Sequence, residues 1–390
     1  MKQLLLLHFL FITLISFGQT NSNYDLIDKK IREIPADFTN STEHLANYIN
    51  AYFKTDEEKI RAVFYWTASN ISYDIKNRLA QNGSIPSQEK IAKALKTRKG
   101  VCIDYAEVFN SIANQVGIKT HIIEGYTKQN GKVNTIAHAW CASKIDNNWY
   151  LFDPTWGAGG ALNGSFIKKM NFNWFKVTPN KMTLSHLPFD YLWQFIAEPL
   201  TNDEFISGKI QTNKPKKNFD FETEIDKYLL LPKGDQFIES TARVEGNGYK
   251  APVVIDYLAV ANKNRTGSIQ NKGIERLNTI VAQYNQAIVL LNDFVFYRNN
   301  KFKPTYSDEQ IEKMILAPRE TLQKCQDEIY TIGPVGAENT TALTNTKRLI
   351  SDALKSNNEQ YQFVQEYLKK SKIGRKLMFS KLSLSGIPRR

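Results

Sequence analysis

Hydrophobic residues recur at helical spacing through the first third of the chain. Apolar positions three and four residues apart predict helices over 45–53, 55–70, 87–95 and 102–117. The second helix opens with Thr55-Asp-Glu-Glu58, the pattern of a capping box, in which the first side chain and the fourth each bond the other's backbone N–H. The last ends at Gly117, a residue that commonly terminates helices.

Beyond Gly117 the pattern changes to that of strands. Short segments rich in apolar residues predict strands over 121–126, 137–144 and 149–153. Asp146-Asn147 joins the last two strands and is typical of a two-residue hairpin loop. Because the helices come first and an antiparallel sheet follows, the predicted fold class is α+β.

The second half of the chain is predicted to be helical. One long amphipathic stripe runs over 274–297, and a second capping box, Ser307-Asp-Glu-Gln310, opens a later helix. The lysine-, asparagine- and proline-rich stretch from Lys209 to Asn218 is typical of a linker or long surface loop. We therefore predict a first domain over 19–208, a linker over 209–219 and a helical domain over 220–390.

The beginning of the sequence has the pattern of a secretory signal peptide. Lys2 is followed by an apolar run from Leu4 to Phe17 and then by small and polar residues. We expect residues 1–18 to be removed and the product to be exported, periplasmic or extracellular, with no membrane-spanning segment. A retained membrane anchor is the alternative.

The chain is basic, with a formal net charge of +12, but its lysines are scattered. Together with the expected export, this argues against nucleic acid as a partner. Only Cys102, Cys141 and Cys325 are present, an odd number that does not suggest a disulfide framework. Cys325 lies on an apolar helical stripe and is expected to be a core residue.

Three residues in order along the chain could form a nucleophilic site. Cys102 stands at a helix start, where the helix dipole and free backbone N–H groups stabilise a thiolate and an oxyanion. His138 and Asp153 lie on the two strands joined by the hairpin. If Ile145 pairs with Asn148, Asp153 falls on the same face as His138 and within reach of its ring. A thiol, a base and an orienting carboxylate are the parts of a catalytic triad.

Other chemistry is less well supported. One Cys, one His and one Asp make a thin set of metal ligands, so neither a metal nor a cofactor is expected. His44, His121 and His186 have no comparable sequence context. Asp104, two residues after the cysteine, could oppose a thiolate by its negative charge.

The motifs around these residues resemble those of the transglutaminase-like superfamily. They read Gly-Val-Cys102-Ile-Asp-Tyr-Ala, His138-Ala-Trp and Trp-Tyr-Leu-Phe-Asp153-Pro-Thr-Trp. The flanks at 64–74, 156–159 and 186–195 are similar to the branch that contains kyphoscoliosis peptidase. The resemblance covers about residues 40–208. It implies a papain-like fold, with Cys102 as nucleophile, His138 as base and Asp153 as orienting acid.

Two positions depart from that branch. Asp104 stands where glycine is frequent, and Cys141 follows His-Ala-Trp where asparagine is common. Cys141 is three residues from His138, so on a strand it should face the opposite side and be packed. Neither departure removes a catalytic group.

Three functions are compatible with this site. The first is a thiol hydrolase that cleaves peptide or amide bonds in a protein or peptide substrate. The second is a crosslinking transglutaminase, which passes the same acyl group to an amine. The third is a non-catalytic scaffold that retains the three residues. Because the sequence contains no acidic loop of the EF-hand type and no evident amine site, we favour hydrolysis.

Overall fold

The computed structural model describes residues 22–79, 85–210, 218–248 and 251–382. The predicted signal peptide at 1–18 and most of the predicted linker lie outside these residues. The chain divides into two compact units, and the first consists of the part up to Leu230 together with Ala242–Leu258. Leu231–Thr241 and the residues from Ala259 onward form the second unit. Helix α9 (Phe221–Leu230), which follows the predicted linker, therefore belongs to the first unit.

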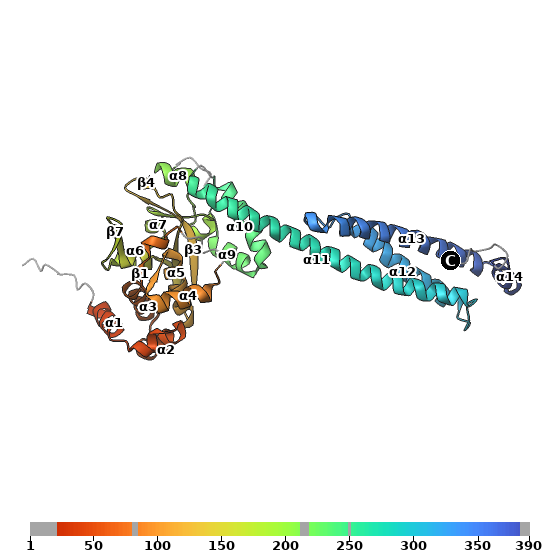
Figure 1. Ribbon diagram of the computed structural model, residues 1–390, viewed down its shortest axis with the longest axis horizontal. Helices are drawn as coiled ribbons and strands as arrows, with labels where there is room; N and C mark the ends of the chain where they lie inside the picture. Colours follow the sequence, from red (N-terminus) through yellow and green to blue (C-terminus); the bar gives the residue numbers. More distant parts are fainter. Residues whose placement is uncertain (1–21, 80–84, 211–217, 249–250, 383–390) are drawn as a thin grey trace, which may run out of the picture. The chain divides into compact units, whose positions relative to one another are not determined.

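The four helices predicted in the first third of the chain are present. They are α2 (Thr42–Tyr52), α3 (Asp56–Asn70), α4 (Ser87–Thr97) and α5 (Cys102–Gln115). The predicted capping box of Thr55 and Glu58 starts α3. Helix α5 is central, because it contacts α2, α3 and α4 as well as the sheet (Figure 1).

One helix of this unit was not predicted. Helix α1 (Ser22–Arg32) packs against α3, and Asp28 accepts two hydrogen bonds of 2.9 and 2.7 Å from the Arg61 guanidinium. Both side chains are buried, so each charge compensates the other where water is excluded.

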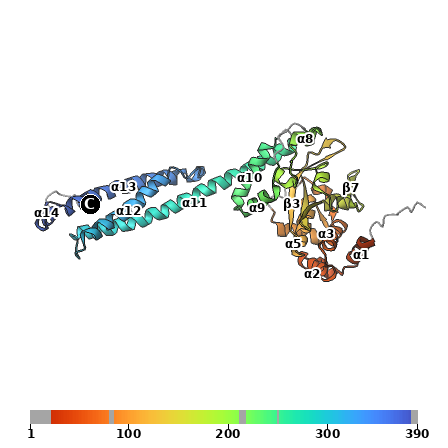
Figure 2. The same ribbon diagram turned by 180° about the vertical axis from the view of Figure 1, so that it is seen from behind.

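The principal sheet is antiparallel and is built around β3 (Thr120–Gln129) (Figure 2). Its main path runs β4 (Lys132–Val133), β3, β5 (His138–Ile145) and β6 (Asn148–Phe152), and β9 (His186–Pro188) also pairs with β3. The pairing of β3 with β9 joins segments about sixty residues apart in sequence. The predicted α+β fold class is confirmed.

The β5–β6 hairpin has the predicted register. Asp146 and Asn147 form the turn with φ of 47° and 62°, and Ile145 pairs with Asn148. Positive φ at both turn residues is typical of the hairpin turn whose twist matches that of the strands. The structure differs at the end of β6, because Asp153 leaves the strand and caps the short helix α6 (Pro154–Ala158). Proline at the first helical position favours this change of direction.

The two faces of the sheet pack into different cores. Ala139 and Cys141 of β5 belong to the core that contains α5, whereas Trp140 and Ala142 belong to a second core on the other face. Cys141 is fully buried and lies near the carbonyl of Ala106 in α5. The prediction that Cys141 is packed is thus confirmed, and α5 is held firmly against β5.

The remaining elements of the first unit are short. They are β1 (Ser72–Tyr73), β2 (Lys99–Gly100), β7 (Gly159–Leu162), β8 (Ser165–Lys168), α7 (Pro179–Met182) and α8 (Asn202–Ser207). Single 3-10 turns lie at Ala36–Thr39, Ile75–Asn77, Phe172–Trp174 and Tyr191–Gln194. Strands β1 and β2 pair in parallel immediately before α5 and so fix where that helix starts.

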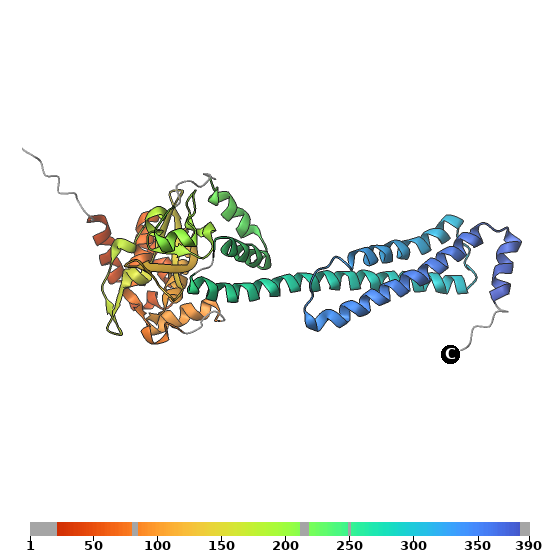
Figure 3. The same ribbon diagram turned by 90° about the horizontal axis from the view of Figure 1, so that it is seen from above.

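The second unit is helical, as predicted. Figure 3 shows α11 (Pro252–Asn299), α12 (Asp308–Glu328) and α13 (Thr340–Leu368) side by side, followed by α14 (Lys372–Leu382). Leu277, Cys325 and Ile350, one from each long helix, share a core. A 3-10 turn at Ala337–Asn339 precedes α13. Helices α10 (Lys233–Gly246) and α11 contribute residues to both units.

Two further predictions for this unit are confirmed. The capping box at Ser307 and Gln310 is present at the start of α12, and Cys325 is a fully buried core residue. Helix α11 begins at Pro252, well before the predicted start at 274. Within the described ranges, none of the helices has the length and hydropathy needed to cross a membrane.

Gly125 in β3 is required by the close approach of its neighbours. A Cβ atom there would lie 2.2 Å from the Leu187 carbonyl oxygen and 2.6 Å from the Trp140 ring. We expect Gly125→Ala to lower the free energy of unfolding of the first unit by about 1–3 kcal/mol, because β9 must move away from β3. All six tryptophans lie in this unit, so tryptophan fluorescence in urea measures the change. Gly160→Ala is the control, because its Cβ would meet open space; an equal loss in both variants would contradict the prediction.

Candidate active site

Cys102 is the first residue of α5, as predicted. Its side chain is partly exposed, whereas Cys141 and Cys325 are buried. Tyr73 of β1 lies close enough for the two side chains to interact electrostatically. Cys102 thus combines access from outside with the position where a helix has free backbone N–H groups and the positive end of its dipole.

His138 lies at the first position of β5, directly opposite Gly125 of β3. Its Nε2 atom lies 2.8 Å from Oδ2 of Asp153, and its side chain is only 10% exposed. The imidazole also lies close enough to the Cys102 side chain for the two groups to interact electrostatically. Because Nε2 is engaged with Asp153, Nδ1 is the nitrogen left for the thiol. The structure therefore brings all three predicted residues together.

The charge state of His138 follows from these partners. Burial opposes the charged ring, but the negative charges of the Asp153 carboxylate and of a Cys102 thiolate raise the pKa of His138 to about 10. The ring is therefore an imidazolium at neutral pH. A cation close to a thiol favours the thiolate, which is the nucleophilic form.

Asp153 is the fully buried centre of the cluster. Its Oδ1 atom accepts hydrogen bonds from the backbone N–H groups of Thr155 (2.9 Å) and Trp156 (3.0 Å). Oδ2 accepts from Nε2 of His138 and from Nε2 of His186, 3.1 Å away. Burial alone would raise the pKa of Asp153, but its interactions with His138 and His186 hold it far below its usual range. The carboxylate therefore stays ionised.

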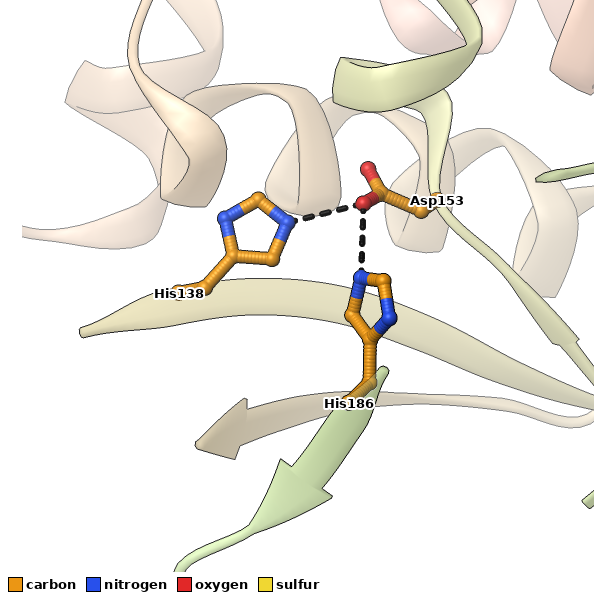
Figure 4. A group of neighbouring side chains, drawn as sticks. All are labelled: His138, Asp153 and His186. Atoms are coloured by element: carbon orange, nitrogen blue, oxygen red, sulfur yellow. Dashed lines mark hydrogen bonds and ion pairs between the residues drawn. The ribbon is translucent and has the colours of Figure 1, made fainter. Parts of the chain in front are cut away.

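His186 is the functional residue that the sequence reasoning missed. Figure 4 shows both imidazole rings directed at the same oxygen of Asp153, His138 from β5 and His186 from β9. His186 lies within the flank His186-Leu-Pro-Phe-Asp190 that carries part of the family resemblance, and that flank was its only sequence signal. Its contact with Asp153 depends on the long-range pairing of β9 with β3.

The geometry also bears on metal binding. Nε2 of His138, Nε2 of His186 and a carboxylate oxygen of Asp153 lie within 4.8 Å of one another. However, both Nε2 atoms lie at hydrogen-bond distance from the carboxylate, where an imidazole donates its proton. An ion at this point would need both nitrogens deprotonated. The three residues therefore fit a hydrogen-bonded cluster better than a metal centre.

Asp104 caps α5. Its Oδ2 atom accepts a 2.8 Å hydrogen bond from the backbone N–H of Val101, and burial raises the pKa of its carboxyl group. A Cβ atom on Gly100 would lie 2.6 Å from that of Asp104, so glycine makes room for the cap. The hydrogen bond favours the carboxylate, but burial outweighs it and favours the neutral acid, which reduces the negative charge that Asp104 presents to the start of the helix.

A pocket of about 730 Å³ lies beside His138. Its aromatic walls are Tyr73, Trp156, Phe166 and Trp174, and the β3–β4 hairpin adds the side-chain amides of Gln129, Asn130 and Asn134. Among the described residues that line it, His138 is the only one that carries charge at neutral pH. The pocket thus presents flat apolar surfaces and neutral hydrogen-bonding groups next to the base.

The other two histidines flagged in the sequence are placed elsewhere. His44 is bonded to Asn40 near the start of α2. His121 of β3 lies between Trp149 and Trp193, where burial lowers its pKa to about 4. Neither contacts the cluster around Asp153.

Parts of the chain are similar to known proteins. The family model of the transglutaminase-like superfamily matches residues 43–154, which include Cys102, His138 and Asp153. Human kyphoscoliosis peptidase is 29% identical in an alignment of 165 positions that covers 39% of this chain and 24% of the relative. Mouse kyphoscoliosis peptidase is 28% identical in an alignment of the same length, which covers the same fractions of the two proteins. A solved structure described as a TGase overlaps 42% of this chain and 40% of its own at 15% identity, with a TM-score of 0.23.

These matches cover part of this chain and part of each relative. The alignments span about a quarter of the length of the kyphoscoliosis peptidases and 39% of this chain. His186 lies beyond the residues that the family model covers. Residues 43–154 thus match the transglutaminase-like superfamily, and part of the chain is similar to kyphoscoliosis peptidase.

Proposed function

We propose that the chain is a thiol hydrolase that cleaves peptide or amide bonds, with Cys102 as nucleophile, His138 as acid and base, and Asp153 as the orienting carboxylate. One observation carries the proposal. Nε2 of His138 lies 2.8 Å from Oδ2 of Asp153, which leaves the opposite side of the ring for the thiol at the start of α5.

In the first half of the reaction, the Cys102 thiolate attacks the carbonyl carbon of the substrate. The bond from Sγ to carbon forms, and the carbonyl electrons move to the oxygen, which the first backbone N–H groups of α5 can stabilise. His138 then gives its Nδ1 proton to the leaving nitrogen as the carbon–nitrogen bond breaks. A free amine departs, and the acyl group remains on Cys102 as a thioester.

In the second half, neutral His138 removes a proton from water, which attacks the thioester carbonyl. The carbon–sulfur bond breaks, the acid is released, and the thiolate–imidazolium pair is restored. An amine in place of water would give acyl transfer with the same residues. The two reactions differ only in the second nucleophile, so the favoured outcome depends on which one reaches the thioester.

The surroundings of His138 support a protein or peptide substrate with neutral side chains at the scissile bond. Aromatic rings such as Trp156 and Trp174 offer flat apolar contacts, and the amides of the β3–β4 hairpin can bond a peptide backbone. With the signal peptide predicted at residues 1–18, we place this reaction outside the cytoplasm.

The reaction class can be tested with a library of unmodified peptides, incubated with and without an added primary amine. We expect new carboxyl and amino ends from hydrolysis, and we expect most product to remain hydrolytic when the amine is present. Mass spectrometry distinguishes the two products, because hydrolysis adds the mass of water and transfer adds that of the amine less ammonia or a leaving peptide.

The Cys102→Ala variant is the control for contaminating enzymes. Products that persist in this variant would contradict the proposal. Predominantly amine-coupled products would identify a transferase. If Cys102 of the wild-type chain reacts no faster with a thiol reagent than a free cysteine and no peptide is converted, the scaffold function is favoured instead.

A further inference from the structure

His186 occupies an enclosed aromatic site that the proposed mechanism does not use. Its side chain is fully buried, and its ring centroid lies 5.1 Å from that of Trp140, 4.5 Å from Trp156 and 5.0 Å from Trp174. Three indole rings thus surround an imidazole that has no contact with water. This environment strongly disfavours a charged ring.

The two nitrogens of His186 have different partners, which determine its tautomer. Nε2 lies 3.1 Å from Oδ2 of Asp153, and Nδ1 lies 2.8 Å from Oγ of Ser185. A carboxylate only accepts, so Nε2 carries the hydrogen. In a neutral ring Nδ1 then accepts from the Ser185 hydroxyl. Consistent with this assignment, burial lowers the pKa of His186 to about 4, despite its contact with Asp153.

Asp153 needs this donor because it has no access to water. Two backbone N–H groups bond Oδ1, but Oδ2 has only the imidazole donors of His138 and His186. During the proposed reaction His138 loses and regains its charge, so for part of each cycle Oδ2 faces a neutral ring there. His186 is the donor whose charge does not change in the cycle.

We propose that His186 is a positioning residue that keeps Asp153 ionised and aimed at His138, and that Ser185 sets the tautomer of His186 that donates. The proposal rests on the roles proposed for His138 and Asp153. It differs from the role of a histidine that merely fills the core, because it acts on the protonation of Asp153. His186 is not itself among the residues that line the pocket, and its effect passes through the carboxylate.

The other titratable groups near Asp153 do not obscure this effect. Burial raises the pKa of Tyr73 to about 12 and raises that of Tyr105 and Cys141 as well. These groups stay neutral in the acid and neutral range.

The test compares His186→Leu with His186→Gln in the full-length chain. Glutamine can place an amide N–H where Nε2 stood, whereas leucine removes the donor and keeps an apolar side chain. The readout is the NMR signal of the Asp153 carboxyl carbon as the pH is lowered. We expect the titration midpoint of Asp153 to rise by about one pH unit or more in the leucine variant, and to stay near the wild-type value in the glutamine variant.

Ser185→Ala is a milder variant that guards against loss of the fold. Without the hydroxyl, His186 can adopt the other tautomer, so we expect a smaller shift of the Asp153 midpoint in the same direction. An unchanged Asp153 midpoint in both His186→Leu and Ser185→Ala, even with a lower melting temperature, would show a purely structural role and overturn the proposal. If His186→Leu does not fold, the midpoint in Ser185→Ala decides alone.

The alkylation rate of Cys102 separates this proposal from the proposed function. If the proposed function holds, the pH at which the alkylation rate falls on acidification rises in His186→Leu, together with the titration midpoint of Asp153. In His186→Gln it stays at the wild-type value. Slow alkylation of the wild-type chain at every pH would refute the nucleophile. The carboxyl signal of Asp153 would still decide the role of His186, because it does not require a reactive thiol.

Discussion

Cys102→Ala is expected to abolish peptide cleavage, with kcat/KM lower by about 10⁶-fold, because the thiol that forms the acyl intermediate is lost and the other two cysteines are buried. The fold should be unaffected, since the side chain is partly exposed and lies at a helix end. The loss is measured on any peptide that the wild-type chain converts, together with labelling by iodoacetamide.

Cys141→Ala is the matched control, because it removes a thiol from the same unit. Cys141 is buried against α5 on the opposite face of β5, and burial raises the pKa of its thiol. We expect this variant to retain cleavage and fast labelling. Equal activity of Cys102→Ala and the wild-type chain would refute the assignment of the nucleophile.

Asp153→Asn is the second change with a large expected effect. Oδ1 accepts from two backbone N–H groups, which cannot become acceptors, so the amide oxygen must take that position. The amide nitrogen then takes the position of Oδ2 and donates toward His138 and His186. To accept, His138 must move its proton to Nδ1, where it can no longer receive the proton of the thiol.

We therefore expect kcat for Asp153→Asn to fall by about 10⁴-fold, the size of effect seen when an amide replaces an orienting carboxylate and imposes the wrong tautomer. KM should change little, because Asp153 is buried beneath the pocket. Asp190→Asn is the control, since Asp190 is another buried carboxylate that caps a turn and pairs with Arg243. A similar loss in both variants would indicate general damage to the fold instead of a changed tautomer.

The parts of the site that could be predicted depend on local structure. The β5–β6 hairpin closes through two residues, so the turn sequence alone determined the register that aligns His138 with Asp153. The start of α5 at Cys102 follows from the helical pattern that begins there. Asp153 acts from a helix cap instead of from a strand, but its carboxylate still reaches the imidazole.

The parts that could not be predicted depend on contacts between distant segments. His186 meets Asp153 because β9 pairs with β3 about sixty residues earlier, and no periodicity in the sequence specifies that pairing. The early start of α11 escaped prediction for a related reason. Residues 252–273 contain few apolar positions at helical spacing after Leu258, so the segment lacks the continuous stripe from which helices are predicted.

The most direct test of the account is the rate at which iodoacetamide labels Cys102 at pH 6 relative to pH 8, with the site identified by mass spectrometry. Since the pKa of His138 is raised to about 10, the imidazolium persists across this range and the thiolate it stabilises should persist as well. We predict rates that agree within about twofold. An ordinary cysteine would react roughly 75-fold faster at the higher pH, and such a rise at Cys102 would contradict the thiolate–imidazolium pair on which the account depends.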